Sequence, residues 1–290
     1  MADLSSSNRN SRGDWRPEAP IALAPINVWP LHISNITKWF FGFPGFLWPY
    51  NAFWLAVTIS TWSYLTPELT TMANLELWWI GIILARNAAL ILILFGGLHL
   101  YLYVFKRQGE AHQFTTRPFA TNNRKFLFKD QVADNMARTL LSAVPIITGY
   151  EVLTYWAFAN GFLGFFDLGS SQLIFWAWFL ILLILAPVIH AVHFYLGHRL
   201  LHTKLLYKKV HALHHHNVEI GPWSGLAMHP VEHIIYLSTL AVQWVLAAHP
   251  VNVLFQLQLA AFYPALAHCG FEKLKIGEKL KIDGGNHFHY

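Results

Sequence analysis

Histidine is the residue type whose number and spacing stand out most in this 290-residue sequence. There are 17 histidines, against 15 aspartates and glutamates together. Two groups lie close together, HRLLH at residues 198–202 and HALHH at residues 211–215. Spacings of three and four residues place side chains on one face of an α-helix. Because neutral imidazole is a common ligand of transition metals, these two groups predict a metal site.

Further histidines and acidic residues follow in the same part of the sequence. Glu232 lies inside a second HxxxH pair, and His268 precedes Glu272 by four residues. His193 is off the face of the first group, so we expect it to line a polar cavity. We interpret the remaining members of this set as residues that orient the ligands: His190, His216, His229, Glu232, His233, Glu272 and His287.

The composition predicts an integral membrane protein. Hydrophobic residues make up 55% of the chain and charged residues only 12%, whereas a soluble domain carries about 25% charged residues. This low charge excludes a soluble globule, and the aromatic content of 16% excludes a disordered chain. A single cysteine, Cys269, excludes a disulfide scaffold, and we expect it to be a buried thiol that binds no metal.

The apolar stretches predict an all-α fold with four transmembrane helices. A crossing needs about 20 apolar residues, and four stretches reach this length: 44–66, 77–104, 140–165 and 172–197. A fifth apolar region, 231–267, is divided at Pro250 into halves that are short for a crossing. We expect a re-entrant or interfacial helical hairpin there, with two further spans as the alternative.

Basic residues predict the orientation in the membrane. Of the 20 lysines and arginines, 19 lie before the first span, between the second and third spans, or after the fourth span. The positive-inside rule therefore places both termini in the cytoplasm. This topology accounts for the basic pI without a nucleic-acid partner. We expect residues 1–30 to be a disordered tail and 31–290 to be one membrane domain, with a metal-binding cytoplasmic cap at 198–230 and 268–290.

HRLLH, HALHH and the connecting GPWSGLAMHPVEH resemble the fatty acid hydroxylase/sterol desaturase superfamily of integral-membrane di-iron enzymes. The resemblance covers roughly residues 190–290 and implies four transmembrane helices with a cytoplasmic helical cap. It implies two iron ions and O2 as co-substrate. It also implies an external electron donor of cytochrome b5-like or ferredoxin type.

The resemblance also implies the ligands, position by position. His198 and His202 match the first histidine box of the superfamily, and His211, His214 and His215 match the second; these five are the expected catalytic residues. His268 matches another ligand position, and His289 matches the first histidine of a third box. Because that box needs two histidines beyond Tyr290, we expect the sequence to be truncated.

These features predict an O2-dependent hydroxylase or desaturase that acts on a lipid of sterol or fatty acyl type. One alternative is a zinc metallopeptidase, since His229-Pro-Val-Glu232-His233 fits the H-x-x-E-H motif. A metal transporter and a non-catalytic lipid-binding relative are further alternatives. Arg86 and Glu151 lie inside predicted spans, where we expect a structural ion pair; contact with a lipid headgroup or a sterol hydroxyl is the alternative.

Overall fold

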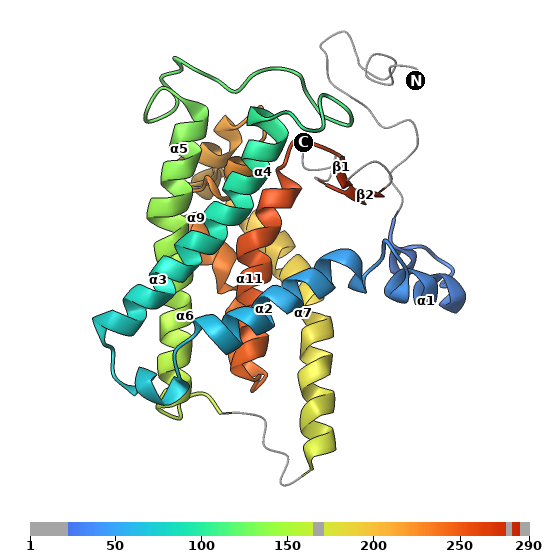
Figure 1. Cartoon of the computed structure of the whole chain (residues 1–290), viewed down its shortest axis with the longest axis vertical. Helices are drawn as coiled ribbons and strands as arrows, with labels where there is room; N and C mark the ends of the chain where they lie inside the picture. The colour runs from blue at the N-terminus through green and yellow to red at the C-terminus, as the bar shows by residue number, and fades with distance from the viewer. Residues whose placement is uncertain (1–22, 165–170, 277–279, 285–290) are drawn as a thin grey trace.

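The computed structural model describes residues 23–164, 171–276 and 280–284, and nearly all regular structure in these ranges is helical (Figure 1). The α-helices are α1 Ile33–Phe41, α2 Ala52–Leu65, α3 Leu77–Ile91, α4 Gly97–His99, α5 Gln131–Arg138, α6 Val144–Ala159, α7 Gln172–Leu201, α8 Lys204–Lys209, α9 Pro230–Leu237, α10 Ala241–Val245 and α11 Pro250–Ala267. Wider π-helical turns continue these helices at Leu92–Gly96, Leu100–Val104 and Thr139–Ala143, and another precedes α2 at Leu47–Asn51. Short 3-10 helices occupy Pro25–Asn27, Leu69–Ala73, His211–His216, Pro222–Leu226 and Ser238–Leu240.

A small antiparallel β-hairpin follows the last helix and was not expected from the sequence. Strand β1 covers Lys273–Ile276 and β2 covers Leu280–Asp283, with Lys273 opposite Asp283. The strands are only four residues long. An alternation of apolar and polar side chains this short does not distinguish a strand from a loop in the sequence. This hairpin departs from the expected all-α cap, while the other regular elements of the described residues are helices, as an all-α fold predicts.

Helix α11 is the centre of the molecule. It packs against α2, α6, α7 and the 3-10 helix Pro222–Leu226, and 16 of its 18 residues are buried. Its polar side chains are hydrogen-bonded to neighbouring segments: Thr58 of α2 donates to Gln258 over 2.7 Å, and Gln256 donates to Thr239 over 2.9 Å. Asn252 donates to the carbonyl of Phe179 in α7 over 3.0 Å. These bonds fix α11 against both sides of the bundle.

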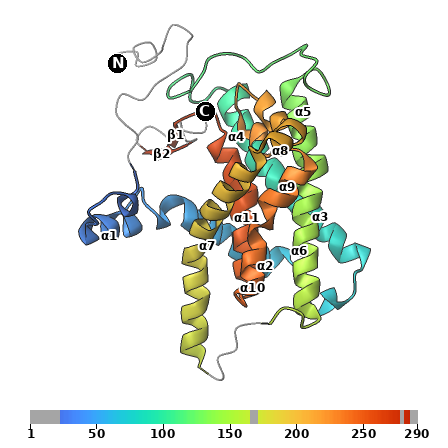
Figure 2. The same cartoon turned by 180° about the vertical axis from the view of Figure 1, so that it is seen from behind.

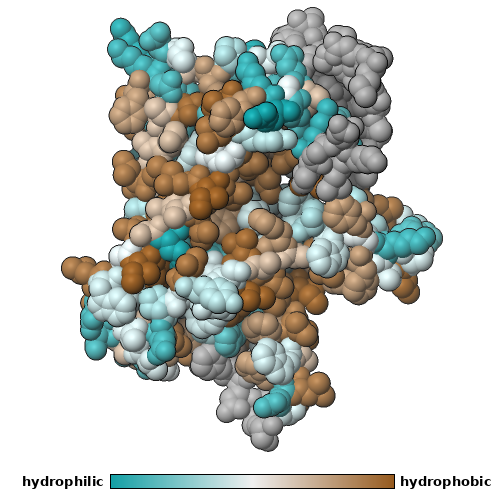
Figure 3. Space-filling view, viewed as in Figure 1, coloured by the Kyte–Doolittle hydropathy of each residue, from teal (hydrophilic) through white to brown (hydrophobic). Residues whose placement is uncertain are grey.

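Two of the helical segments are long and apolar enough to cross a membrane, Leu77–Val104 and Gln172–Leu201. They coincide with the second and fourth expected spans. On the face shown in Figure 3, hydrophobic side chains cover much of the middle of the molecule, and hydrophilic ones gather at the upper end. The structure thus supports a membrane protein.

The other two expected spans look different. Before α2, Trp48 has an extended backbone between Pro44 and Pro49, so the helix begins only at Ala52 and has 14 residues. The third helical segment begins at Gln131, well before residue 140, because Asp130 caps its first turn by accepting a hydrogen bond from Ala133. Crossing by these two segments stays a prediction.

The apolar region 231–267 forms two helical arms. Helices α9 and α10 make the first arm, and α11 returns after a turn in which Ala247 has φ +50°. The ring of His249 caps α11 by accepting a hydrogen bond from the amide of Val251 over 3.2 Å. The two arms therefore meet at Pro250, where α11 begins, while a re-entrant or interfacial placement in the membrane stays a prediction.

Helix α7 carries a proline near its middle. Pro187 cannot donate a backbone hydrogen bond to Leu183, and a proline inside a helix usually bends it. Figure 2 shows the first half of α7 standing apart from the other helices, whereas the second half lies against them. The bend lets the end of α7 cover the upper part of α11.

Arg86 of α3 and Glu151 of α6 form an ion pair between two packed helices, as expected. Their charged atoms are in direct hydrogen-bonding contact, and both side chains are buried. Asn87 donates to the second carboxylate oxygen over 3.0 Å, and Arg86 also donates to Thr66 over 3.0 Å. Both charges are satisfied inside the protein, so the structural interpretation is favoured over contact with lipid.

Replacing one partner of this pair is expected to destabilise the protein strongly. Breaking a buried ion pair costs about 3–5 kcal/mol, because the remaining charge is left without a partner. We expect Glu151→Leu to lower the unfolding temperature of the detergent-purified protein, and the double variant Arg86→Leu with Glu151→Leu to recover much of the loss. Glu68→Gln, at an exposed position, is the control. Equal unfolding temperatures for Glu151→Leu and this control would contradict a structural role.

Candidate metal centre

Four imidazoles meet at the end of α7. His198 and His202 come from its last turn, and His211 and His215 come from the 3-10 helix that follows α8. One ring nitrogen from each of the four lies within 4.8 Å of the others. The Nε2 atoms of His198 and His202 are 3.1 Å apart, and those of His211 and His215 are 3.0 Å apart. Atoms this close can share one metal ion.

The local backbone differs between the two histidine groups. His198 and His202 lie one α-helical turn apart, as their spacing predicts. Residues 211–216 form a 3-10 helix instead, in which residues three apart share a side. The rings of His211 and His214 stack at 5.7 Å accordingly. The expectation that an α-helix aligns this group is wrong, but the cluster forms because the short helix is packed against the end of α7.

Glu232 of α9 fixes the orientation of His211. Its Oε1 atom lies 2.7 Å from Nδ1 of His211, and both side chains are buried. A carboxylate accepts the Nδ1 proton, so Nε2 is left as the nitrogen that faces the cluster. Burial raises the pKa of Glu232, and the hydrogen bond from His211 partly opposes this rise. The expected orienting role of Glu232 is consistent with this contact.

His214 and His268 form a second pair beside the cluster. Their ring centroids are 5.3 Å apart. Nδ1 of His268 lies 3.2 Å from the carbonyl of Pro264, which accepts its proton and leaves Nε2 as the nitrogen with ligand character. This pair marks a candidate second metal position. His287 and His289, the other residues expected near it, lie outside the described residues.

His233 and His229 have local roles in α9. Both ring nitrogens of His233 have partners: Nδ1 is 3.0 Å from the hydroxyl of Ser142, and Nε2 is 3.0 Å from the carbonyl of Leu226. Burial lowers the pKa of His233 to about 4, so the ring is neutral near pH 7. His229 caps α9 by accepting a hydrogen bond from the amide of Val231 over 3.2 Å.

The remaining expected residues divide into two groups. His190 and His193 line the cavity described below; Nε2 of His190 is 3.5 Å from the hydroxyl of Tyr236, and Nε2 of His193 is 3.0 Å from that of Ser238. His216 is exposed and lies outside the four-histidine cluster. Glu272 begins the β-hairpin segment, where its amide donates to the carbonyl of His112 over 2.9 Å.

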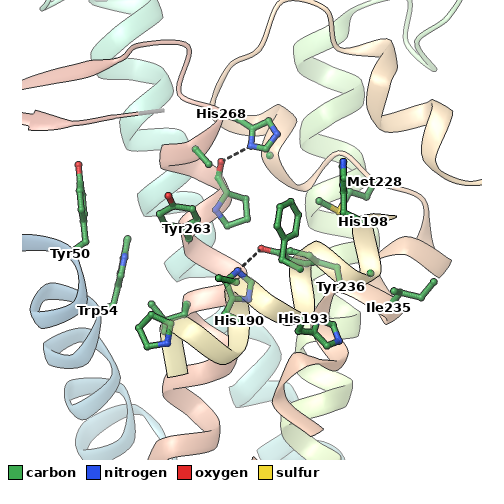
Figure 4. A pocket seen from close by; sticks show the side chains of 18 of the residues that line it. Tyr50, Trp54, His190, His193, His198, Met228, Ile235, Tyr236, Tyr263 and His268 are labelled. Atoms are coloured by element: carbon green, nitrogen blue, oxygen red, sulfur yellow. Dashed lines mark hydrogen bonds between the residues drawn. The ribbon is translucent and has the colours of Figure 1, made fainter. Parts of the chain in front are cut away.

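A cavity of about 610 Å³ leads to the histidines. Figure 4 shows Tyr50 and Trp54 on one side and His190 and Tyr236 on the other, with His268 and His198 above them. Four of the expected ligands, His198, His211, His214 and His268, contribute to the lining. Tyr236 was not predicted to be part of the site, although it lies four residues after Glu232 and therefore on the same helical face. Tyr50, Trp54 and Tyr263 carried no signal, because only the tertiary fold brings them here.

Comparison with known proteins bears directly on this site. Residues 183–290, which contain all four clustered histidines, match the family model described as fatty acid hydroxylase. This part of the chain is therefore similar to fatty acid hydroxylase domains. The resemblance of the histidine motifs to the fatty acid hydroxylase/sterol desaturase superfamily is thereby confirmed.

Several curated proteins are similar to the domain. Fatty acid hydroxylase domain-containing protein 2 of Homo sapiens is 36% identical over 97 residues, which are 32% of this chain and 29% of that protein. Methylsterol monooxygenase 2-1 of Arabidopsis thaliana is 27% identical over 61% of this chain and 65% of its own length. Delta(7)-sterol 5(6)-desaturase ERG3B of Gibberella zeae is 31% identical over 50% and 40%, respectively. The chain thus spans less than two thirds of each relative, and no solved structure matches it.

Weakening the contact between Glu232 and His211 is expected to lower metal affinity. Loss of a partner behind a ligating histidine typically costs about 10–100-fold in affinity. We expect Glu232→Gln to fall in this range when purified protein competes with a chelator for Fe(II). Glu219→Gln is the matched control, because Glu219 pairs with Arg117 over 3.1 Å and is not part of the cluster. Identical affinities for the two variants would show that Glu232 does not tune the site.

Proposed function

We propose that this protein is a membrane-bound di-iron oxidoreductase that uses O2 to hydroxylate or desaturate a lipid. The observation that carries the proposal is the position of the histidine cluster at the end of a cavity with a largely apolar lining. A sterol substrate is consistent with the similar methylsterol monooxygenase and sterol desaturase, and a fatty acyl substrate is consistent with the matching fatty acid hydroxylase family.

The donor set fits iron. Six imidazoles gather in two neighbouring groups, and the neutral form of imidazole suits iron among the first-row metals. Thiolate ligation is not indicated, since the Cys269 thiol is buried and donates to the carbonyl of Phe271 over 3.2 Å. We propose His198, His202, His211 and His215 as one ligand set, with His214, His268 and His289 contributing to the second. When bound, iron would activate O2, which is the oxidant that attack on an unactivated C–H bond requires.

The protein's own residues position the substrate and exclude water. Phe194 lies against His198, with ring centroids 5.3 Å apart, and forms the cavity wall nearest the cluster. Tyr236 packs edge-on against Phe194, with ring centroids 6.0 Å apart, and is held by the hydrogen bond that it donates to Ala260 over 2.8 Å. A lipid that lies in the cavity against these two rings is held beside the cluster in an apolar environment.

We also propose where electrons enter. Helix α8 carries Lys204, Lys208 and Lys209, all exposed, directly after His202. A basic surface beside the cluster attracts an acidic donor and steers its docking. A cytochrome b5-like or ferredoxin-type protein fits this surface. This face would lie on the cytoplasmic side, which agrees with both termini being cytoplasmic.

Lipid profiling of a host that expresses the full chain tests the proposed activity. We expect a lipid product that gains one oxygen or loses two hydrogens in cells with the wild-type protein, and loss of that product with His211→Ala. Growth under ¹⁸O2 separates the two reactions, because only hydroxylation places the label in the product. Identical lipid profiles for both proteins, at equal expression and iron content, would contradict an enzymatic function.

A zinc metallopeptidase is disfavoured by the geometry of residues 229–233. Glu232 contacts His211 rather than standing free as a general base, and His233 has partners on both nitrogens. A metal transporter is disfavoured because the cluster lies at one end of α7, whereas transport sites lie near the middle of the bilayer.

Metal analysis of two histidine variants separates the proposed centre from a peptidase site. We expect His211→Gln to lose iron and His233→Gln to retain it, because His211 is in the cluster and His233 only braces α9. Iron per chain is measured after anaerobic loading of the purified proteins. Loss of metal in His233→Gln, with retention in His211→Gln, would instead support the peptidase motif.

A further inference from the structure

The segment before α2 is exposed although it is rich in apolar side chains. None of residues 23–50 is buried in the structure. Trp29 is 84% exposed, Ile33 81% and Phe41 65%. Large exposed apolar patches mark surfaces that something else covers. We call residues 23–50 the collar.

The collar is folded rather than extended. Phe46 stacks on Phe40 with ring centroids 5.1 Å apart, and its amide donates to the carbonyl of Trp39 over 2.8 Å. Gly45 permits this return of the chain, because a Cβ there would lie 2.2 Å from the same carbonyl. The main packing partners of α1 are the segments that flank it, Pro25–Asn27 and Leu47–Asn51. Figure 1 accordingly shows α1 projecting sideways from the body.

Helix α1 has two distinct faces. At 100° per residue, Ser34, Asn35 and Lys38 share one side, whereas Ile33, Ile36 and Phe40 share the other. Such a helix typically lies in the plane of a membrane, with its apolar face among the acyl chains and its cationic face toward the headgroups. This pattern indicates that a lipid leaflet covers the exposed apolar face of α1.

The cavity indicates how deep in the membrane the collar lies. Trp39, Phe46 and Tyr50 line the same cavity as Pro187 and Phe194 of α7. Those α7 residues lie 15 and 22 positions after Gln172, or about 22–33 Å along the helix. The hydrocarbon core is ~30 Å thick. If α7 crosses from Gln172, the collar lies at the boundary of the leaflet nearer the histidines.

We propose that the collar lies in the plane of this leaflet and forms the port through which a lipid enters the cavity sideways. The inference rests on the proposed function for the fate of that lipid, but the position of the collar does not depend on turnover. Trp39 and Phe46 form the edge of the port on the collar, and Pro187 and Ala191 form its edge on α7.

Accessibility of labels on α1 tests the position. Ile33→Cys and Asn35→Cys lie on opposite faces, and both sites are exposed. In lipid nanodiscs, we expect a nitroxide at Ile33 to relax with O2 and to be shielded from a water-soluble nickel chelate, and a nitroxide at Asn35 to show the reverse. The wild-type chain, whose only cysteine is buried, gives the labelling background.

Equal access of the nickel chelate to both labels would overturn the proposal, because the collar would then lie in water. Shielding of Ile33 from both reagents would overturn it as well, because a second copy or another protein would then cover α1.

Photocrosslinking tests the port. With p-benzoylphenylalanine introduced at Phe194 inside the cavity, we expect lipid adducts by mass spectrometry of the protein from membranes. Ile33→Asp, which puts a charge on the apolar face of α1, is expected to reduce these adducts several-fold, whereas Asn35→Asp leaves them unchanged. Unchanged adducts in Ile33→Asp would show another route and overturn the port. Neither measurement needs iron or turnover, so an inactive protein with both expected results would contradict only the proposed function.

Discussion

The candidate metal centre is built around the burial of His211 against the carboxylate of Glu232. Both side chains are removed from water, so each needs the other as a hydrogen-bond partner. The contact joins α9 to the short helix 211–216, and this helix brings His215 to the end of α7. α9 is itself held by His233, which bonds to Ser142 and Leu226. The ligand geometry is therefore supported from behind by three separate segments.

Buried polar side chains with partners also connect the helices of the bundle. Gln256 and Gln258 in α11, and Arg86 and Glu151 between α3 and α6, all lie deep in an otherwise apolar interior. Each finds a partner on a neighbouring helix. Among lipids the hydrophobic effect does not hold helices together, so packing and such polar contacts decide which helices associate. These polar contacts favour this one packing arrangement of the helices over others.

Much of this could be predicted from local sequence pattern. The positions of His198 and His202 on one turn follow from helix periodicity, and the pair Arg86 with Glu151 follows from the cost of isolated charges in an apolar medium. The family resemblance was carried by motifs within a single segment of about 100 residues.

The remainder depended on tertiary structure. Residues 250–267 are as apolar as a membrane-facing helix, yet they form the buried centre because α2, α6 and α7 surround them. The 3-10 form of residues 211–216 depends on packing against α7 and α9, and propensity alone does not indicate it. The cavity walls at Tyr50 and Tyr236 come from segments almost 190 residues apart, so no local pattern could have joined them.

The four clustered imidazoles differ in their contact with water. His211 is fully buried, whereas His202 and His215 are exposed and His198 is intermediate. One side of the site is therefore fixed by the fold through Glu232, and the other side faces water. An ion that comes from the surface would meet the exposed His202 and His215 first and reach the buried His211 last, so metal loading has a direction, from the open surface inward.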